Sequence, residues 1–98
     1  MHKHSEIFLE TLGQLVKHTR SEAMMSQDEL AIRIGVSRKT ISAIERGIGV
    51  NSVALANVLD FLSLLPYLAE PVEQRLDLLE DGPKRKLRKA KQELPNDF

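Results

Sequence analysis

The 98-residue chain lacks cysteine and tryptophan, and its aromatic residues are one tyrosine and three phenylalanines. The absence of cysteine excludes disulfide bonds, thiolate zinc sites and cysteine nucleophiles, and it suits a reducing compartment. Because hydrophobic residues still make up 42% of the chain, the core must be largely aliphatic, which favours helices. We therefore expect an all-α fold with one hydrophobic core.

Long hydrophobic runs are missing as well. The longest apolar stretch, Val53 to Leu65, is interrupted by Asn57, Asp60 and Ser63, so it is too short and too polar to span a bilayer. The first residues show no apolar block followed by a small-residue cleavage site, as a secretory signal would. We therefore expect a cytoplasmic protein without a membrane partner.

The patterns of common catalytic and cofactor sites are also missing. The chain has no phosphate-binding P-loop and no His-Glu-x-x-His motif, and the pair Gly47 and Gly49 lacks the preceding strand of a dinucleotide fingerprint. We assign no catalytic role to His2, His4 or His18. The sequence thus predicts no enzymatic activity, no metal site and no cofactor.

Charge is balanced in total but not along the chain. Fourteen lysine and arginine residues match fourteen aspartate and glutamate residues. Residues 33–46 nevertheless carry a net charge of +3 and residues 84–91 carry +6, whereas residues 70–83 carry −4. The first basic segment contains Arg33, Arg38, Lys39 and Arg46 against Glu45. The neutral total therefore does not exclude a polyanionic partner.

Apolar spacing and capping residues predict three helices in the first half of the chain. The first, from Ile7 to Thr19, has a stripe at spacings of three and four. Ser26 begins the second helix, since Ser26-Gln27-Asp28-Glu29 has the spacing of a capping box, and Gly35 ends it. Ser37 caps the third helix, which stops at Gly47. The inward residues are Phe8, Leu12, Leu15, Val16 and Thr19, then Leu30, Ala31 and Ile34, then Ile41 and Ile44.

Two further helices are predicted after the loop at Gly47. Ser52 can cap a fourth helix that extends to Pro66, and a fifth lies between Pro71 and Gly82. Their apolar positions are Val53, Ala56, Leu59 and Leu62 in the fourth, and Val72, Leu76 and Leu79 in the fifth. This divides the chain into a helical domain over residues 1–69, a short acidic helix over 70–82 and a basic tail over 83–98.

Two short helices joined by a turn containing Gly35, the second of them basic on its solvent face, are typical of the helix-turn-helix arrangement. From Leu12 to Leu65 the sequence resembles the phage repressor and Cro family, also called the Xre family. The matching residues are Ser26-Gln27-Asp28-Glu29-Leu30-Ala31, Gly35-Val36-Ser37, Ile41-Ser42 and Ile44-Glu45-Arg46-Gly47. The resemblance implies a compact five-helix bundle of the lambda-repressor-like DNA-binding type with a carboxy-terminal extension.

The same resemblance implies how double-stranded DNA would be contacted. In that family the first residues of the third helix read base edges in the major groove, which assigns this role to Arg38, Lys39 and Ser42. Arg38 and Lys39 are the candidates for guanine O6 and N7. Phosphate contacts are expected from Gln27, Thr40 and Arg46.

Three residues outside the DNA contacts also bear on the resemblance. Arg20 and Glu45 resemble a family ion pair that joins the end of the first helix to the third, and we expect this pair to be structural. Met24 departs from the family, which often has glycine in the turn after the first helix. We therefore expect that turn to differ in shape.

The segment Leu62-Ser63-Leu64-Leu65, followed by the acidic segment and the basic tail, is similar to HipB-like antitoxins of toxin-antitoxin systems. Such a protein would act in transcription regulation as a homodimer that represses its own operon at a palindromic operator. It would also hold a kinase-like toxin inactive. A phage or stand-alone repressor without a toxin partner is the alternative.

Simpler interpretations stand beside each of these predictions. The cationic residues of the third helix could form a solvated face, and Val72, Leu76 and Leu79 belong either to the core or to a dimer contact. The basic tail is either a solubilising segment or a contact to DNA or a partner. The whole bundle could also be a protein-interaction module that does not bind DNA.

Overall fold

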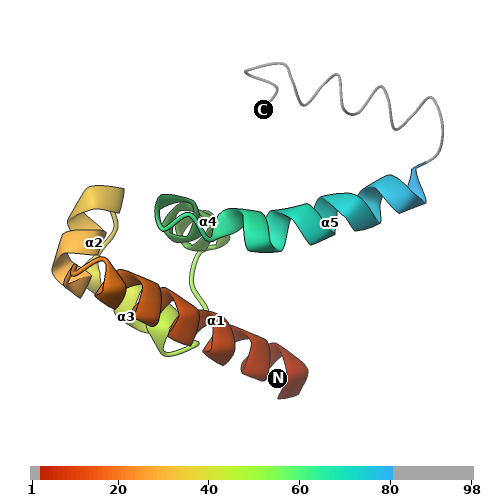
Figure 1. Ribbon diagram of the computed structural model, residues 1–98. Coiled ribbons are helices and arrows are strands. Elements are labelled where there is room, and N and C mark those ends of the chain that lie inside the picture. The colour runs from red at the N-terminus through yellow and green to blue at the C-terminus, as the bar shows by residue number, and fades with distance from the viewer. Residues whose placement is uncertain (1–2, 81–98) are drawn as a thin grey trace. The chain divides into compact units, whose positions relative to one another are not determined.

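The computed structural model describes residues 3–80, which form five α-helices and no strand. The helices are α1 (Lys3–Glu22), α2 (Gln27–Ile34), α3 (Arg38–Glu45), α4 (Ser52–Phe61) and α5 (Leu65–Leu79) (Figure 1). The predicted all-α fold is thereby confirmed. The predicted basic tail over 83–98 lies outside the described residues. The chain divides into two units between Leu65 and Pro66, so that α1 to α4 form one unit and α5 belongs almost entirely to the other.

The core of the first unit is aliphatic, as the scarcity of aromatic residues predicts. Helix α3 packs against both α1 and α2 and therefore lies at the centre of the unit (Figure 1). Each fully buried aliphatic side chain contributes about 1.5 to 3 kcal/mol to folding. The buried apolar residues are Leu12, Val16, Leu30, Ala31, Ile41, Ile44, Val58, Leu59, Leu62 and Leu64.

The contact between α1 and α3 depends on Gly13, which is buried in the middle of α1. A Cβ atom at this position would clash with the carbonyl oxygen of Ile44 and lie 2.7 Å from that of Glu45. The glycine therefore lets α1 lie directly against the backbone at the carboxyl end of α3. Sequence periodicity did not indicate this role, because a glycine adds nothing to an apolar stripe.

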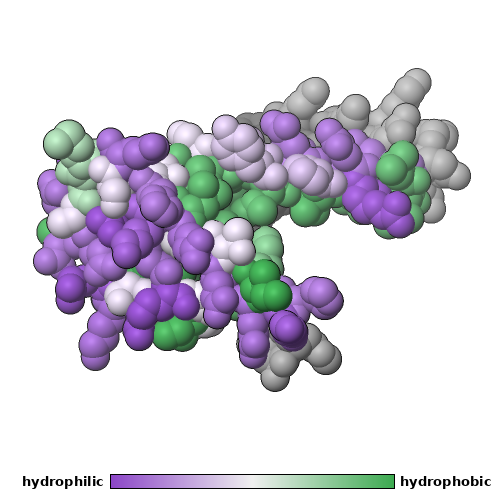
Figure 2. Space-filling view, turned by 60° about the horizontal axis from the view of Figure 1, so that its bottom comes forward, coloured by the Kyte–Doolittle hydropathy of each residue, from purple (hydrophilic) through white to green (hydrophobic). Residues whose placement is uncertain are grey.

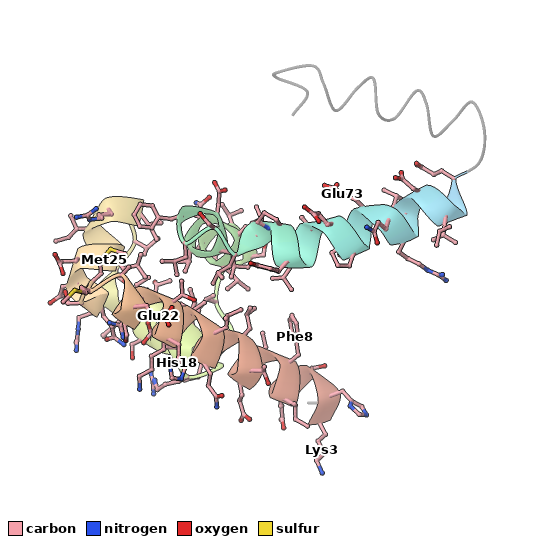
Figure 3. The ribbon with its side chains drawn as sticks, in the orientation of Figure 1. Lys3, Phe8, His18, Glu22, Met25 and Glu73 are labelled. Carbon is pink, nitrogen blue, oxygen red and sulfur yellow. The ribbon has the colours of Figure 1, made fainter. Side chains whose placement is uncertain are left out.

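Helix α1 is longer than predicted and buries a narrower stripe. Leu12 and Val16 are buried, but Phe8 and Leu15, both predicted to face inward, are exposed. In Figure 3 the Phe8 side chain projects away from the helix. The stripe is narrow because the backbone of α3 approaches Gly13, leaving Phe8 and Leu15 on the flanks of the contact.

Helices α1 to α4 all end in the same motif, with a left-handed residue at Met24, Gly35, Gly47 and Ser63 respectively. In α1 the Met25 amide donates to the Arg20 carbonyl at 3.2 Å, and in α4 the Leu64 amide donates to the Leu59 carbonyl at 2.7 Å. These bonds are typical of the Schellman motif. Met24 has a φ of 59°, so the turn after α1 adopts the conformation that glycine favours although a methionine occupies it. The expectation that Met24 would change the shape of this turn is therefore wrong.

Helix α4 differs from the prediction at both ends, and its last residue is Phe61 although the prediction extended it to Pro66. Asn51 rather than Ser52 is its N-cap, and the Asn51 Oδ1 accepts from the amides of Val53 and Ala54 at 2.8 and 3.2 Å. The buried face is formed by Val58, Leu59 and Leu62, whereas Val53 is 64% exposed. Val53 and Ala56 are exposed because helical geometry turns them away from this buried face, so the predicted stripe was wrong at both positions.

Helix α5 begins at Leu65 and continues through Pro71, although the sequence pattern predicts a boundary at this proline. Pro66 lies in the first turn, where a missing amide proton removes no helical hydrogen bond. Pro71 removes one such bond inside the helix. None of the described residues of α5 is buried. Within residues 3–80 no single helix is long and apolar enough to cross a membrane. Only α4 and α5 taken together, with a bend between them, have the length and composition for it.

Candidate nucleic-acid interface

Local interactions fix the ends of α2 and the start of α3. The Ser26 Oγ accepts from the Glu29 amide and the Glu29 carboxylate accepts from the Ser26 amide, both at 3.0 Å. Gly35 ends α2 with a φ of 83°, and the Ser37 Oγ accepts from the Thr40 amide at 3.1 Å. The capping box, the glycine stop and the serine cap are thus confirmed.

Helix α3 separates an apolar face from a cationic one. Ile41, Ile44 and Glu45 are buried, and helical geometry places Arg38, Lys39, Ser42 and Arg46 on the other side. Arg38, Lys39 and Arg46 are exposed, whereas Ser42 is half-buried. Figure 2 shows hydrophilic side chains gathered around α2 and α3. The second helix of the pair therefore presents long hydrogen-bond donors to solvent.

Several of the predicted site residues have contacts that the sequence did not indicate. The Arg38 Nε lies 3.6 Å from the Asp28 Oδ1, and the Arg46 Nε donates to the Ser42 carbonyl at 3.4 Å. The Thr40 Oγ1 lies 3.0 Å from the Ser37 Oγ. Arg38 and Ser42 are brought together on one face of α3, one turn apart, as a base-reading pair would be.

Glu45 is the centre of a hydrogen-bonded cluster that joins α1, α2 and α3. The Arg20 guanidinium donates through Nε to Oε2 at 2.6 Å and through Nη2 to Oε1 at 3.0 Å. The Gln27 Nε2 donates to Oε1 at 2.9 Å. Arg20 also donates through Nη1 to the Met25 carbonyl at 2.7 Å, and Figure 3 labels Met25 close to α2. The cluster ties α3 to both preceding helices.

The electrostatics of this cluster favour the ionised pair. Burial would raise the pKa of Glu45, but hydrogen bonds from Arg20 and Gln27 and the nearby positive charges hold it below its ordinary value. The hydrogen bond to Glu45 raises the pKa of Arg20 against the opposing effect of burial. The side chains are only 11% and 3% exposed, so water screens the interaction weakly.

The sequence did not predict the hydrogen-bonded environment of Gln27. This residue is predicted to contact phosphate, and its amide also donates to Glu45, eighteen residues away in the chain. An amide nitrogen carries two hydrogens, so one N–H of Gln27 remains for a second acceptor. No local pattern could indicate this bond, because it depends on how α2 packs on α3.

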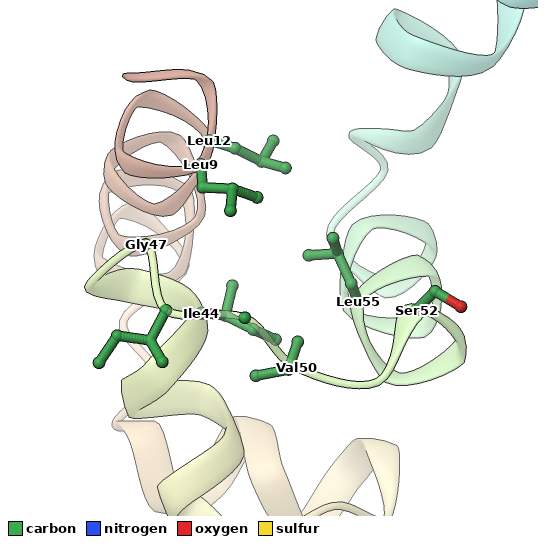
Figure 4. Close-up of a pocket in the computed structure, with 9 residues that line it drawn as sticks. Leu9, Leu12, Ile44, Gly47, Val50, Ser52 and Leu55 are labelled. Carbon is green, nitrogen blue, oxygen red and sulfur yellow. The ribbon is translucent and has the colours of Figure 1, made fainter. Parts of the chain in front are cut away.

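A small apolar pocket of about 200 Å³ lies between α1, the loop after α3 and the start of α4 (Figure 4). It is lined mainly by aliphatic side chains, including Leu9, Leu12, Ile44, Val50 and Leu55. Such a lining offers no charged group for catalysis or for an anion. Within residues 3–80 no group of three His, Asp or Glu side chains could hold a metal ion.

Two short helices joined by a tight turn, with the second presenting a cationic face while its other face is buried, define a helix-turn-helix DNA-binding domain. Comparison with known families supports this class, since residues 11–73 match the helix-turn-helix domain. The chain therefore belongs to the helix-turn-helix domain family, whose partner is DNA. A comparison with curated proteins gave no match.

Proposed function

We propose that this protein is a sequence-specific transcriptional repressor of the Xre type, which acts in the cytoplasm without enzymatic activity or a cofactor. The observation that carries the proposal is the arrangement of α3, where Arg38, Lys39 and Ser42 share one face opposite the buried Ile41 and Ile44. A helix of this width and polarity fits the major groove of B-DNA.

In this proposal Arg38, Lys39 and Ser42 read base edges. Arg38 and Lys39 are long enough to donate to guanine O6 and N7. Phosphates are bound by Gln27, Thr40 and Arg46, which fix the orientation of the domain on the duplex. The bond from Gln27 to Glu45 supports this role for Gln27, because it orients the amide while leaving one N–H for a phosphate oxygen.

We further propose that the protein binds a palindromic operator as a homodimer through α5. Five apolar residues of this helix recur at alternating spacings of four and three, as in a coiled-coil seam, and none of them is buried. They are Leu65, Ala69, Val72, Leu76 and Leu79. A second copy of the helix would cover this stripe.

We also propose that this repressor is a HipB-like antitoxin, which represses its own operon and holds a kinase-like toxin inactive. It is supported by the resemblance of residues 62–65 and of the segments that follow them. Finding a kinase-like reading frame beside this gene would support the antitoxin role. Its absence favours a phage or stand-alone repressor that uses the same DNA-binding domain.

Two variants test the proposed DNA contacts. Arg38→Ala should lower specific binding by about 1 to 3 kcal/mol and relax the preference at one base pair, as expected for a lost bidentate contact. Gln27→Ala should weaken binding to all duplexes by similar factors, since a phosphate carries no base identity. Binding constants for a duplex selected from a random pool, and for its single-base variants, measure both effects.

The same binding experiment distinguishes a repressor from a protein-interaction module. Affinity should fall steeply with salt, because each neutralised phosphate releases counterions. A symmetric footprint with half-site centres about 34 Å apart is expected for a dimer. A flat salt response and identical specificity profiles of the two variants would contradict the proposal and favour the interaction module.

A further inference from the structure

Asp28 is an acidic residue placed on the cationic side of the helix-turn-helix unit. It lies in the first turn of α2 and faces the first residue of α3, with its Oδ1 3.6 Å from the Arg38 Nε. The two side chains are 68% and 65% exposed. A carboxylate at this position would repel a DNA phosphate, so its presence there calls for a compensating interaction.

Capping of α2 does not account for Asp28. The capping box is completed by Ser26 and Glu29 alone, with both of its hydrogen bonds at 3.0 Å. A carboxylate in a first turn also interacts favourably with the helix dipole, but Glu29 already supplies a negative charge in the same turn. What distinguishes Asp28 from Glu29 is its approach to the Arg38 guanidinium.

The geometry of this approach matches what a base-reading arginine needs. Nε is the guanidinium nitrogen nearest to the carboxylate, and at 3.6 Å the contact is an ion pair rather than a hydrogen bond. All five N–H donors of Arg38 therefore remain available for another acceptor. A guanine offers two acceptors, O6 and N7, to such a planar donor group.

We propose that Asp28 is a positioning residue that restricts the Arg38 side chain and so increases its discrimination in favour of guanine. This inference rests on the proposed function, in which Arg38 reads a base. A free arginine loses side-chain freedom when it binds, and a neighbouring carboxylate that orders it beforehand reduces that loss. The same carboxylate weakens binding to DNA in general, because it repels phosphates whatever the sequence.

A double-mutant cycle tests the proposal with four proteins: wild type, Asp28→Asn, Arg38→Ala and the double variant. Asparagine keeps the size of the side chain and removes only its charge. Each protein is titrated with the duplex that wild type selects from a random pool, with versions substituted at the base pair affected by Arg38→Ala, and with a scrambled duplex. The Arg38→Ala background is the matched control, since it retains phosphate repulsion by Asp28 but has no guanidinium to position.

Asp28→Asn should lower the discrimination at that base pair by about three- to tenfold, the effect of freeing one long side chain. Its affinity for the scrambled duplex should rise. In the Arg38→Ala background the discrimination should not respond to Asp28→Asn. The effect should also diminish at high salt, because an exposed ion pair is screened, and Asp28→Glu should restore part of the discrimination.

Unchanged or increased discrimination in Asp28→Asn would overturn the proposal. It would also be overturned if Asp28→Asn changed the discrimination by the same factor in the Arg38→Ala background as in wild type. These results are distinct from failure of the proposed function. If wild type prefers no duplex, or if Arg38→Ala changes discrimination at no base pair, the assignment of Arg38 to base reading is wrong, and the role of Asp28 falls with it.

Discussion

Gly13 determines how closely α1 approaches α3. The carbonyl oxygens of Ile44 and Glu45 occupy the space that a side chain at position 13 would need. These atoms belong to backbone and not to a flexible side chain, so the structure can accommodate a methyl group only by moving α1 or α3.

Gly13→Ala should therefore destabilise the protein by about 1 to 3 kcal/mol, the usual effect of overpacking, although alanine is the better helix former. Urea unfolding measures the change in free energy. Gly49→Ala is the matched control, because no atom lies within 4 Å of a Cβ at Gly49, and it should leave the midpoint nearly unchanged. Equal stability of Gly13→Ala and wild type would contradict the close approach of the two helices.

At the scale of the helices, the cluster around Glu45 connects three elements through one carboxylate. Arg20 comes from α1, Gln27 from α2 and Glu45 from α3. Removing the charge of Glu45 leaves the Arg20 guanidinium without its partner in a nearly buried position. Loss of one member of such a pair costs about 3 to 5 kcal/mol.

This cluster predicts a pH dependence of stability. The pKa of Glu45 is lowered in the folded protein, so the unfolded chain binds a proton at this residue at higher pH than the folded one. The stabilisation is present above the unfolded pKa and is lost as the pH falls through the folded pKa. The difference in unfolding free energy between wild type and Glu45→Gln should therefore be large at pH 7 and decrease in acid.

Chemical denaturation at a series of pH values between neutral and strongly acidic measures this difference. Glu22→Gln is the control, since Glu22 is an exposed carboxylate near the end of α1 and should show a small difference at every pH. A difference for Glu45→Gln that does not change with pH would show that the ionised pair does not stabilise the fold.

For the whole molecule, the proposed function requires that a domain with a single helix for base reading bind DNA specifically. One helix contacts only a few base pairs, and helix-turn-helix proteins commonly bind as dimers that contact two half-sites. The apolar stripe of α5 is the surface that we propose for the contact. None of the residues of this stripe is buried.

Val72→Asp should therefore shift the protein from dimer to monomer and lower its operator affinity, while the unfolding of the α1 to α4 unit changes little. A charge in the centre of an apolar seam is costly to bury. Sedimentation equilibrium measures the association state. Gln74→Asp adds the same charge at an exposed position outside the stripe and should remain dimeric. A dimeric Val72→Asp would place the dimer contact on another surface.

The sequence by itself determined those features that depend on residues close together in the chain. The capping box at Ser26, the left-handed stop at Gly35 and the cap at Ser37 each involve atoms only a few residues apart. Backbone geometry and side-chain chemistry decide such contacts before any packing occurs. For the same reason the helix-turn-helix unit and the cationic side of its second helix could be predicted.

Only the tertiary structure decided which side chains meet across helices. The bond from Gln27 to Glu45 and the approach of Asp28 to Arg38 depend on the packing of α2 on α3, and the role of Gly13 depends on the packing of α1 on α3. The narrow buried stripe of α1 and the continuation of α5 through Pro71 have a similar origin. An apolar or polar pattern shows which face of a helix avoids water, but the partner that each residue meets depends on the distances and angles between helices, and these arise only when the whole chain packs.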